Sequence, residues 1–526
     1  MPKPVTSDTN FGHSGRVVDA GRIASFRSPA DRPVRSGMRA LLVVSEAPPI
    51  VSGVSRAVAE LTRGLEQRGF VVDTVSSNEI RRWTLGEVRV SAFAAHWRSL
   101  SRTFDDYDVV NVHGPVPTMS DAFLTFFRSR PRLARPALVY THHSSIDLPR
   151  LGPLCRLYDD VTARMARVAD RTVVTTESYA TAMRSKGVPS VEVIPWGVDA
   201  DRFSADREPR TEGPLRILFL GQLRPYKGIS IAVRAVARHR ELELTIAGSG
   251  PQEGQLRREV AALGATNVRF VGRVPDEDLP GLYRNHEVVV LPSTTRAEAF
   301  GLVLLEGMAA GCVPVASDLP GVRDIAGPTG LLVQPDDPEE LRNRLISLAR
   351  DPERRQRLAS ASAVAARGFS WDRVGNRYAA TFWAAAEEVL ARRGSAILRA
   401  PVHPNLAIEA FARRFNATWW SFMLFHGESV RPAPVAWGRA GHMKFHLSRS
   451  PVAEYVAHER RPVLLDGDST PSDLRSLMTR DDVSSAIAVP VGNSTRTVGV
   501  LSLSIGRDHI GRYTNRDLAD LAALVA

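Results

Sequence analysis

Cysteine is almost absent from this sequence, because its 526 residues include only Cys155 and Cys312. Two cysteines cannot form a disulfide framework or a cysteine-based zinc site, so we expect a reducing compartment. Long apolar runs are missing as well, since none approaches the roughly 20 residues that a membrane-spanning helix needs. The N-terminal residues lack the continuous apolar stretch of a secretory signal. These absences predict a cytoplasmic protein.

Clusters of arginine with aromatic residues are also missing, although the chain is basic. Lysine and arginine number 68 against 57 acidic residues, which gives a net charge of +11. Because the basic residues are scattered, we do not expect nucleic acid as a partner. An anionic ligand, or peripheral contact with the inner face of an anionic membrane, suits this charge better. The sequence has no evident cluster of metal ligands, and we expect no metal or other cofactor.

The length of the chain predicts three or four domains. Residues 1–37 are rich in Pro, Gly, Ser, Asp and Arg without an apolar period, and we expect a disordered arm. In 38–205, short apolar runs such as "YDVVNVHG" and "PALVYTHH" alternate with helical stretches. A second series, in 214–372, follows the linker "REPRTEGP" and includes "LRILFLG" and "EVVVLPS". Two such series predict an α/β protein with two doubly wound, Rossmann-like domains that face each other across a cleft.

The remaining sequence predicts a helix over 373–394, within "FSWDRVGNRYAATFWAAAEEVLARR", and a separate α+β domain over 400–526. This domain begins with the amphipathic segment "PNLAIEAFARRFNA" and continues with strands at "WWSFMLFHG" and "RPVLLDGD". The segment "SSAIAVPVGNSTRTVGVLSLSIG" predicts a hairpin around a Gly-Asn-Ser turn. We expect Thr514 to cap the final helix.

Candidate functional residues follow the strands, at the edge where doubly wound sheets bind ligands. Gly53 opens a helix just after a strand, where the backbone can approach a phosphate; an ordinary strand–helix turn is the alternative. Arg224 and Lys227 lie on a strand-end loop and could neutralise a diphosphate, or form a solvated basic loop. Glu298 lies in a loop and Glu306 in the helix that follows it. Two carboxylates on a cleft wall suit the hydroxyls of a sugar and a ribose.

Several segments between residue 38 and about residue 390 stand in the order of a known family. They are "PPIVSGVSRAV", "YTHHSS", "VIPWGVD", "GQLRPYKG", "IAGSGP", "FVGRVPDEDLPGLY" and "PSTTRAEAFGLVLLEGMAAGCVPVAS". Together they resemble a retaining glycosyltransferase of family 4 with the GT-B fold, whose Glu-x7-Glu signature is in the last segment. The resemblance implies a nucleotide-diphosphate sugar as donor. It leaves the acceptor open among glycans, lipids and small molecules.

The resemblance also implies a role for each matching position. Glu306 would bind the ribose hydroxyls of the donor, and Gly53 would face its phosphates. The catalytic group would consist of His143 near the anomeric carbon, Glu298 beside the donor sugar and Lys227 at the diphosphate. The other donor contacts would come from Arg273 and Val274 at the base and from Ala299, Phe300, Gly301 and Leu302 at the sugar.

Two positions depart from the pattern of the family. Gln222 stands where the diphosphate loop usually has an arginine, and Ser52 stands where a second glycine is common. We expect Arg224 to supply the missing charge, with a solvated loop charge as the alternative.

The C-terminal domain resembles a GAF domain in "SAIAVPV", "VGVLSLSIG" and its final Thr-x-x-Asp-Leu helix. This resemblance implies a small ligand of the GAF-like domain or a homodimer formed through it, and a regulatory or sensory role. The domain has no cysteine, which excludes a bilin attached through that residue. We expect His426, His442 and His446 to be surface or packing residues rather than haem ligands.

The family implies a metal-independent reaction in which the acceptor attacks from the face that the diphosphate leaves, with retention of configuration. The alternative is a non-catalytic protein that binds a nucleotide sugar or a small ligand on a degenerate GT-B fold. Glu298, Glu306, Lys227 and His143 are all present, which favours the enzyme. A nucleotide-sugar epimerase on the same fold does not match the Glu-x7-Glu region.

Overall fold

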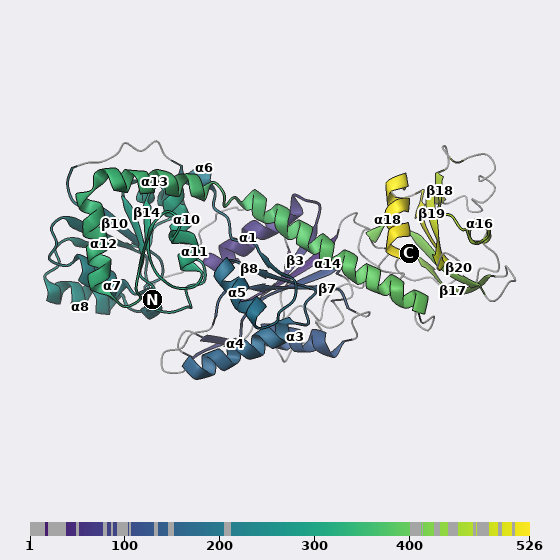
Figure 1. Cartoon of the computed structure of the whole chain (residues 1–526), viewed down its shortest axis with the longest axis horizontal. Helices are drawn as coiled ribbons and strands as arrows, with labels where there is room; N and C mark the ends of the chain where they lie inside the picture. The colour runs from purple at the N-terminus through teal and green to yellow at the C-terminus, as the bar shows by residue number, and fades with distance from the viewer. Residues whose placement is uncertain are drawn as a thin grey trace, which may run out of the picture.

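Three lobes lie in a row in the computed structural model, and one long helix, α14 (Trp371–Arg399), runs from the middle lobe to the C-terminal lobe (Figure 1). The structure describes residues 16–18, 38–48, 52–76, 82–85, 88–91, 104, 107–130, 135–145, 152–204, 212–399, 412, 414–425, 432–439, 451–466, 470, 483–492, 497–507 and 511–525. Within these ranges, no helix is long and apolar enough to span a bilayer.

The middle lobe is the N-terminal domain. It contains a parallel sheet of seven strands in the order β1-β3-β2-β6-β7-β8-β9. The strands are β1 (Arg16–Val18), β2 (Arg39–Val44), β3 (Val71–Ser76), β6 (Val109–Gly114), β7 (Ala137–His142), β8 (Arg171–Val174) and β9 (Val191–Val193). Its helices are α1 (Gly53–Glu66), α3 (Ser120–Ser129), α4 (Gly152–Ala166) and α5 (Glu177–Ser185), and β4 (Arg82–Leu85) pairs separately with β5 (Val88–Ser91). The short helix α6 (Ala200–Phe203) that follows packs against the second domain (Figure 1). Every residue of β6 and β7 is buried, as expected for strands covered on both faces.

Strand β1 lies within the segment that the sequence predicts to be disordered. Its residues, Arg16–Val18, pair in parallel with β3 at the edge of the sheet. An edge strand has unpaired backbone groups, which a short β-branched segment can satisfy. Residues 1–15 and 19–37 lie outside the described residues.

The second domain contains a parallel sheet of six strands in the order β12-β11-β10-β13-β14-β15. The strands are β10 (Leu215–Leu220), β11 (Leu242–Ala247), β12 (Val268–Gly272), β13 (Val288–Leu291), β14 (Val313–Ser317) and β15 (Leu331–Val333). The helices are η6 (Pro225–Lys227), α7 (Ile229–Val236), α8 (Glu253–Leu263), η7 (Asp276–Asp278), α9 (Leu279–Arg284), α10 (Leu302–Ala309), α11 (Val322–Ala326), α12 (Pro338–Arg350) and α13 (Pro352–Ala366). The strand order reverses between β10 and β13, so ligands are expected at the carboxyl ends of these two strands.

The C-terminal domain has an antiparallel sheet in the order β17-β16-β20-β19-β18. Its elements are β16 (Trp419–Phe425), β17 (Pro432–Arg439), α16 (Pro451–Glu459), β18 (Val463–Asp466), β19 (Val483–Gly492), β20 (Thr497–Gly506) and α18 (Asn515–Val525). The Thr514 hydroxyl accepts from the backbone N–H of Asp517 at 3.3 Å, which confirms the predicted cap. The three sheets confirm the predicted fold class. The hairpin turn, most of the expected first helix and the histidines at 426, 442 and 446 lie outside the described residues.

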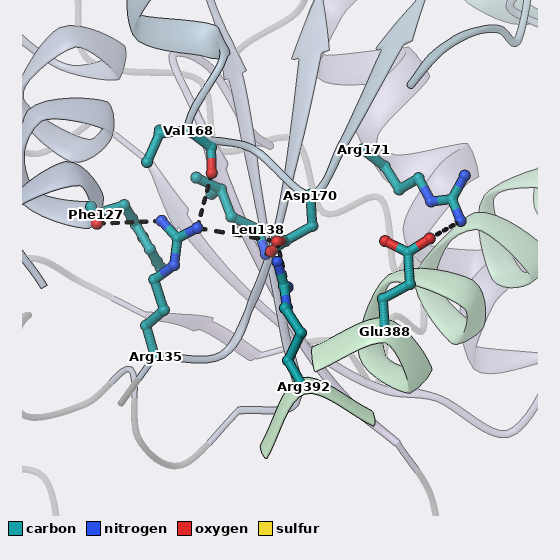
Figure 2. Close-up of polar contacts among 8 residues, drawn as sticks. All are labelled: Phe127, Arg135, Leu138, Val168, Asp170, Arg171, Glu388 and Arg392. Atoms are coloured by element: carbon teal, nitrogen blue, oxygen red, sulfur yellow. Dashed lines mark hydrogen bonds and ion pairs between the residues drawn. The ribbon is translucent and has the colours of Figure 1, made fainter. Parts of the chain in front are cut away.

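Helix α14 is fixed to the N-terminal domain by charged side chains (Figure 2). Arg392 of α14 donates to the buried carboxylate of Asp170 at 2.5 Å, and Arg135 approaches the same carboxylate at 3.9 Å. Asp170 also accepts from the backbone N–H of Leu138 at 2.8 Å, so the start of β7 takes part. A buried carboxylate needs such partners, because leaving it unpaired would cost several kcal/mol. The helix is therefore held firmly before it reaches the C-terminal domain.

The two Rossmann-like domains are joined at a point where two segments of chain run side by side. The backbone N–H of Val198 donates to the Phe369 carbonyl at 2.6 Å, and Val198 forms an isolated parallel bridge with Ser370. A Cβ added at Gly197 would lie 2.6 Å from the backbone nitrogen of Trp371, so the close approach requires glycine here.

Candidate active site

Two loops of the second domain meet where the strand order reverses. One follows β10 and the other follows β13, and they touch at Gly228, whose φ is 64°. A Cβ added to Gly228 would lie 1.8 Å from the carbonyl oxygen of Pro292, so no larger residue fits there. This contact brings Lys227, from the first loop, beside Glu298, from the second.

Lys227 and Glu298 form an ion pair in which both side chains are mostly buried. The hydroxyl of Ser293 also donates to Glu298, at 3.3 Å. Burial alone would lower the pKa of Lys227, but the Glu298 carboxylate and the Tyr226 side chain outweigh it, so the pKa of Lys227 is raised. The amine therefore remains a cation in the loop that follows β10.

Glu306 lies on α10 and is bound by residues of both domains. Tyr283 donates to its Oε2 at 2.8 Å, and Arg56 of α1 donates to its Oε1 at 2.6 Å. Burial raises the pKa of Glu306, while Arg56 and Tyr283 oppose that change. Arg56 also pairs with Asp276, which in turn pairs with Arg202 at 3.0 Å. A chain of alternating charges thus crosses the interface between the domains beside Glu306.

The first residues of two helices, α1 and α10, are in contact across this interface. Helix α1 begins at Gly53, where Ser52 caps it by accepting from the N–H of Ser55 at 3.1 Å. Helix α10 begins at Leu302, after Gly301 with a φ of 81°. A Cβ on Gly53 would lie 3.7 Å from Cδ1 of Leu302, so the two helix starts are in contact distance. Unpaired N–H groups at helix N-termini favour anions, and two converging N-termini suit a diphosphate.

His143 follows β7 in the N-terminal domain and lies against two aromatic rings. Its Nε2 is 2.9 Å from Nδ1 of His113, and its ring stacks on Trp196 with centroids 5.5 Å apart. Burial lowers the pKa of His143 to about 4, so the ring is neutral at neutral pH. His142 instead packs against Tyr179 inside the domain.

The other predicted residues lie in the second domain, in the loops after β10 and β12 and in the segment before α10. The Arg224 guanidinium donates from Nε to the Gln222 side chain at 2.7 Å, so the two loop residues that the sequence contrasts are paired. Arg273 is exposed and Val274 is half-buried in the loop after β12. Ala299 is half-buried and Phe300 is buried, in the segment that leads into α10.

Sequence reasoning missed three residues that complete this arrangement. Arg56 and Tyr283 both hold Glu306, and His113 contacts His143. Tyr283 and His113 lie within segments that are quoted above, "FVGRVPDEDLPGLY" and "YDVVNVHG". Arg56 also lies in a quoted segment, "PPIVSGVSRAV", but an arginine on the polar side of an amphipathic helix is usual, so the segment did not indicate its contact with Glu306.

Family models match the chain over three consecutive regions. The model of glycosyltransferase family 4 matches residues 51–202, that of glycosyl transferases group 1 matches residues 201–364, and that of the GAF domain matches residues 405–526. The D-rhamnosyltransferase WbpZ of Pseudomonas aeruginosa is 34% identical over 263 residues, which are 48% of this chain and 66% of that protein. The O-antigen chain mannosyltransferase C of Escherichia coli is 32% identical over 286 residues, which are 49% of this chain and 74% of that protein.

The fold also matches solved structures. Anabaena Alr3699/HepE, solved in complex with UDP, superposes with a TM-score of 0.53 and 19% identity, and the match covers 66% of this chain and all 100% of that one. At this identity the likeness supports the fold alone, which is the GT-B arrangement of two Rossmann-like domains. With sequence, relatives and fold in agreement, the chain belongs to the family 4 glycosyltransferases, and a GAF domain follows its transferase domains.

Proposed function

We propose that this glycosyltransferase moves a hexosyl residue from a nucleotide-diphosphate sugar to a hydroxyl of a cell-envelope glycan or lipid, with retention and without a metal. The observations that support the proposal are the pairing of Lys227 with Glu298, which precedes α10 in the chain, and the contact between the starts of α10 and α1. The lysine comes from the second domain and α1 from the first, so both domains contribute groups that favour an anion. A leaving diphosphate needs such charge, because negative charge accumulates on it as the glycosidic bond breaks.

The donor is held, in this proposal, by the second domain. Glu306 accepts hydrogen bonds from the ribose hydroxyls while it keeps Tyr283 and Arg56, because a carboxylate has about four lone-pair sites. Glu298 lies beside the sugar, where Lys227 and Ser293 already bind its Oε2. A carboxylate held in this way is a poor nucleophile. This supports direct attack by the acceptor from the face that the diphosphate leaves.

Relatives that transfer rhamnosyl and mannosyl groups favour a donor sugar of the same kind, although the nucleotide is open. The test is a screen of UDP-, GDP- and ADP-linked hexoses, with the product mass and its anomeric configuration measured. We expect one donor to be consumed and an α-linked donor to give an α-linked product. Inversion would overturn the proposed mechanism. Nucleotide-sugar binding without consumption of any donor would favour the non-catalytic alternative.

The β10 loop offers a first prediction, because Arg224 lies against the glutamine that replaces the family's arginine. We expect Arg224→Ala to lower kcat nearly as much as the loss of Lys227, since a guanidinium near the phosphates stabilises the same developing charge. Gln222→Arg in the Arg224→Ala background should restore much of the activity, because one guanidinium can replace the other. Near-wild-type kinetics for Arg224→Ala would show instead that its charge is solvated.

We further propose that the enzyme acts at the inner face of the membrane and that α4 contacts the lipid. Leu154, Leu157 and Val161 are 60%, 59% and 41% exposed, and their spacing places them along one side of the helix. Arg156 and Arg164 are exposed on the same helix. An apolar stripe with basic neighbours suits an anionic bilayer surface.

Vesicle sedimentation tests this contact. The full chain should sediment with phosphatidylglycerol vesicles, and Leu154→Ser with Leu157→Ser should weaken binding by about tenfold or more, because each leucine contributes up to about 1.5–3 kcal/mol when buried. The matched control is Val364→Ser, which removes an apolar side chain that is 69% exposed on α13 of the other domain. Equal loss in both variants, or no binding by the wild type, would refute the role of α4.

The GAF domain completes the proposal as a regulatory unit that binds a small ligand or a second copy of the chain. Its support is α14, which reaches from the transferase domains to the C-terminal lobe (Figure 1).

A further inference from the structure

Polar side chains connect α14 to His143 through the interior of the N-terminal domain. The hydroxyl of Tyr378, on α14, is 3.3 Å from that of Thr141, whose Oγ1 accepts from the Asn111 amide at 2.9 Å. Oδ1 of Asn111 is 2.7 Å from Nε2 of His113, and Nδ1 of His113 is 2.9 Å from Nε2 of His143. The first four of these side chains are buried, and His143 at the end is half-buried.

The orientation of the Asn111 amide determines which atoms donate and which accept in this series of hydrogen bonds. Its Nδ2 is 3.1 Å from the carbonyl oxygen of Val139. A carbonyl oxygen only accepts hydrogen bonds, so the atom facing it must be the NH2 group. The amide oxygen is therefore the atom that faces His113. Because that oxygen also only accepts, Nε2 of His113 must carry a proton.

The tautomer of His143 follows from that of His113. Burial lowers the pKa of His113 well below its usual value, and the nearby His143 lowers it further, so His113 is neutral. With its proton on Nε2, a neutral His113 has a lone pair on Nδ1 and can only accept there. The partner atom, Nε2 of His143, must then be the donor. A neutral His143 consequently has its own lone pair on Nδ1.

Aromatic packing keeps the rings in this arrangement. Trp196 stacks on His143 with an interplanar angle of 22°, and on Tyr378 with an angle of 5°. The backbone N–H of His143 also donates to the carbonyl oxygen of Gly114 at 2.8 Å. Rotation of the His143 ring would break both the stacking and the bond to His113.

We propose that Asn111 and His113 are positioning residues that hold His143 as the Nε2–H tautomer, so that Nδ1 accepts a hydrogen bond from a hydroxyl of the bound sugar. The proposal rests on the proposed transferase function for the sugar contact, whereas the tautomer follows from the hydrogen bonds between two neutral rings and needs no substrate. His143 then orients the sugar and does not donate a proton to it. The role of Asn111 and His113 is to exclude the tautomer of His143 that carries its proton on Nδ1.

The tautomer can be measured without any substrate. The full chain would be prepared with 15N-labelled histidine, and its long-range 1H–15N spectrum recorded at neutral pH, because protonated and unprotonated ring nitrogens differ widely in 15N shift. The signals of His143 and His113 would be assigned from their losses in His143→Gln and His113→Gln. We expect a protonated Nε2 and an unprotonated Nδ1 in both rings. A protonated Nδ1 in His143, or a mixture of tautomers, would overturn the proposal.

Two substitutions of His113 then test its effect on turnover. Leucine removes the acceptor for His143, so we expect mixed tautomers and a kcat that falls about tenfold, the value of one hydrogen bond, with nucleotide affinity unchanged. Glutamine can accept from His143 and donate to Asn111, so His113→Gln should retain most of the activity. Thr172→Val, at a fully buried position in neighbouring β8, is the matched control and should have no effect.

The two failures can be told apart. If the wild-type spectrum shows the expected tautomer but no nucleotide sugar is consumed, the proposed function fails and the tautomer assignment stands. If His113→Leu keeps full kcat in an active enzyme, the positioning role is refuted. Equal loss of kcat in the leucine and glutamine variants would likewise refute it. The positioning role predicts that only glutamine, which can accept from His143, retains activity, whereas a purely structural role predicts no such difference.

Discussion

Replacing Lys227 with alanine is expected to lower kcat about 100-fold while changing donor affinity much less. The reason is that negative charge builds up on the diphosphate only as the glycosidic bond breaks. Steady-state kinetics with the donor found in the screen would measure both parameters. A rise in KM with kcat unchanged would show that the lysine only binds the donor.

This variant needs a control for folding, because Lys227 also neutralises the mostly buried Glu298. Removing one partner of a buried pair can cost up to about 3–5 kcal/mol of stability. The double variant Lys227→Ala with Glu298→Gln removes the unpaired charge as well. We expect its Tm to recover toward that of the wild type while kcat stays low, which would separate the stabilising role of the lysine from its catalytic role.

Glu306→Ala should weaken donor binding at least about tenfold, because a hydrogen bond to a charged acceptor contributes about 1.5–3 kcal/mol. Isothermal titration calorimetry with the nucleotide diphosphate would measure the loss. Glu306→Gln is the matched variant, since the amide oxygen can still accept from Tyr283 or a ribose hydroxyl. We expect it to bind with intermediate affinity. Unchanged affinity in Glu306→Ala would reject the ribose assignment.

The same carboxylate predicts a pH dependence. Burial raises the pKa of Glu306 above its usual value. The ionised carboxylate is the better hydrogen-bond acceptor. The affinity for the nucleotide sugar should therefore be highest above this raised pKa and should fall as the pH drops through it. In Glu306→Gln that decrease should be absent, because the amide does not titrate. A decrease that persists in the glutamine variant would have to come from another group.

The sequence supplied the fold and the two signature acids because both depend on local pattern. The short apolar, β-branched runs of β6 and β7 are typical of strands covered on both faces, and every residue in them is buried. Glu298 and Glu306 flank an apolar run, a spacing that places one carboxylate in a loop and the other on a helix. Both features are contained within fewer than about ten neighbouring residues, so no knowledge of tertiary contacts was needed.

The partners of these acids could not be predicted in the same way. Arg56 lies 250 residues before Glu306 in the chain, and only the docking of the two domains brings them together. His113 meets His143 because β6 and β7 pair with His113 opposite Thr141, and this register comes from the sheet as a whole. Strand patterns indicate which residues are buried, but they do not say which strand is the neighbour.

The paired crossing at Val198 and Phe369 limits the movements that we expect between the two transferase domains. Because the two connections are hydrogen bonded to each other, they form a single axis rather than two independent tethers. Rotation about this axis keeps the Val198 bond, whereas sliding one domain past the other would break it. The helix starts at Gly53 and Leu302 should therefore separate by rotation. The farther these residues lie from the axis, the more the proposed diphosphate site should open for a given rotation. A bulky residue at Gly197, against Trp371, would force this axis apart and change the whole arc of opening.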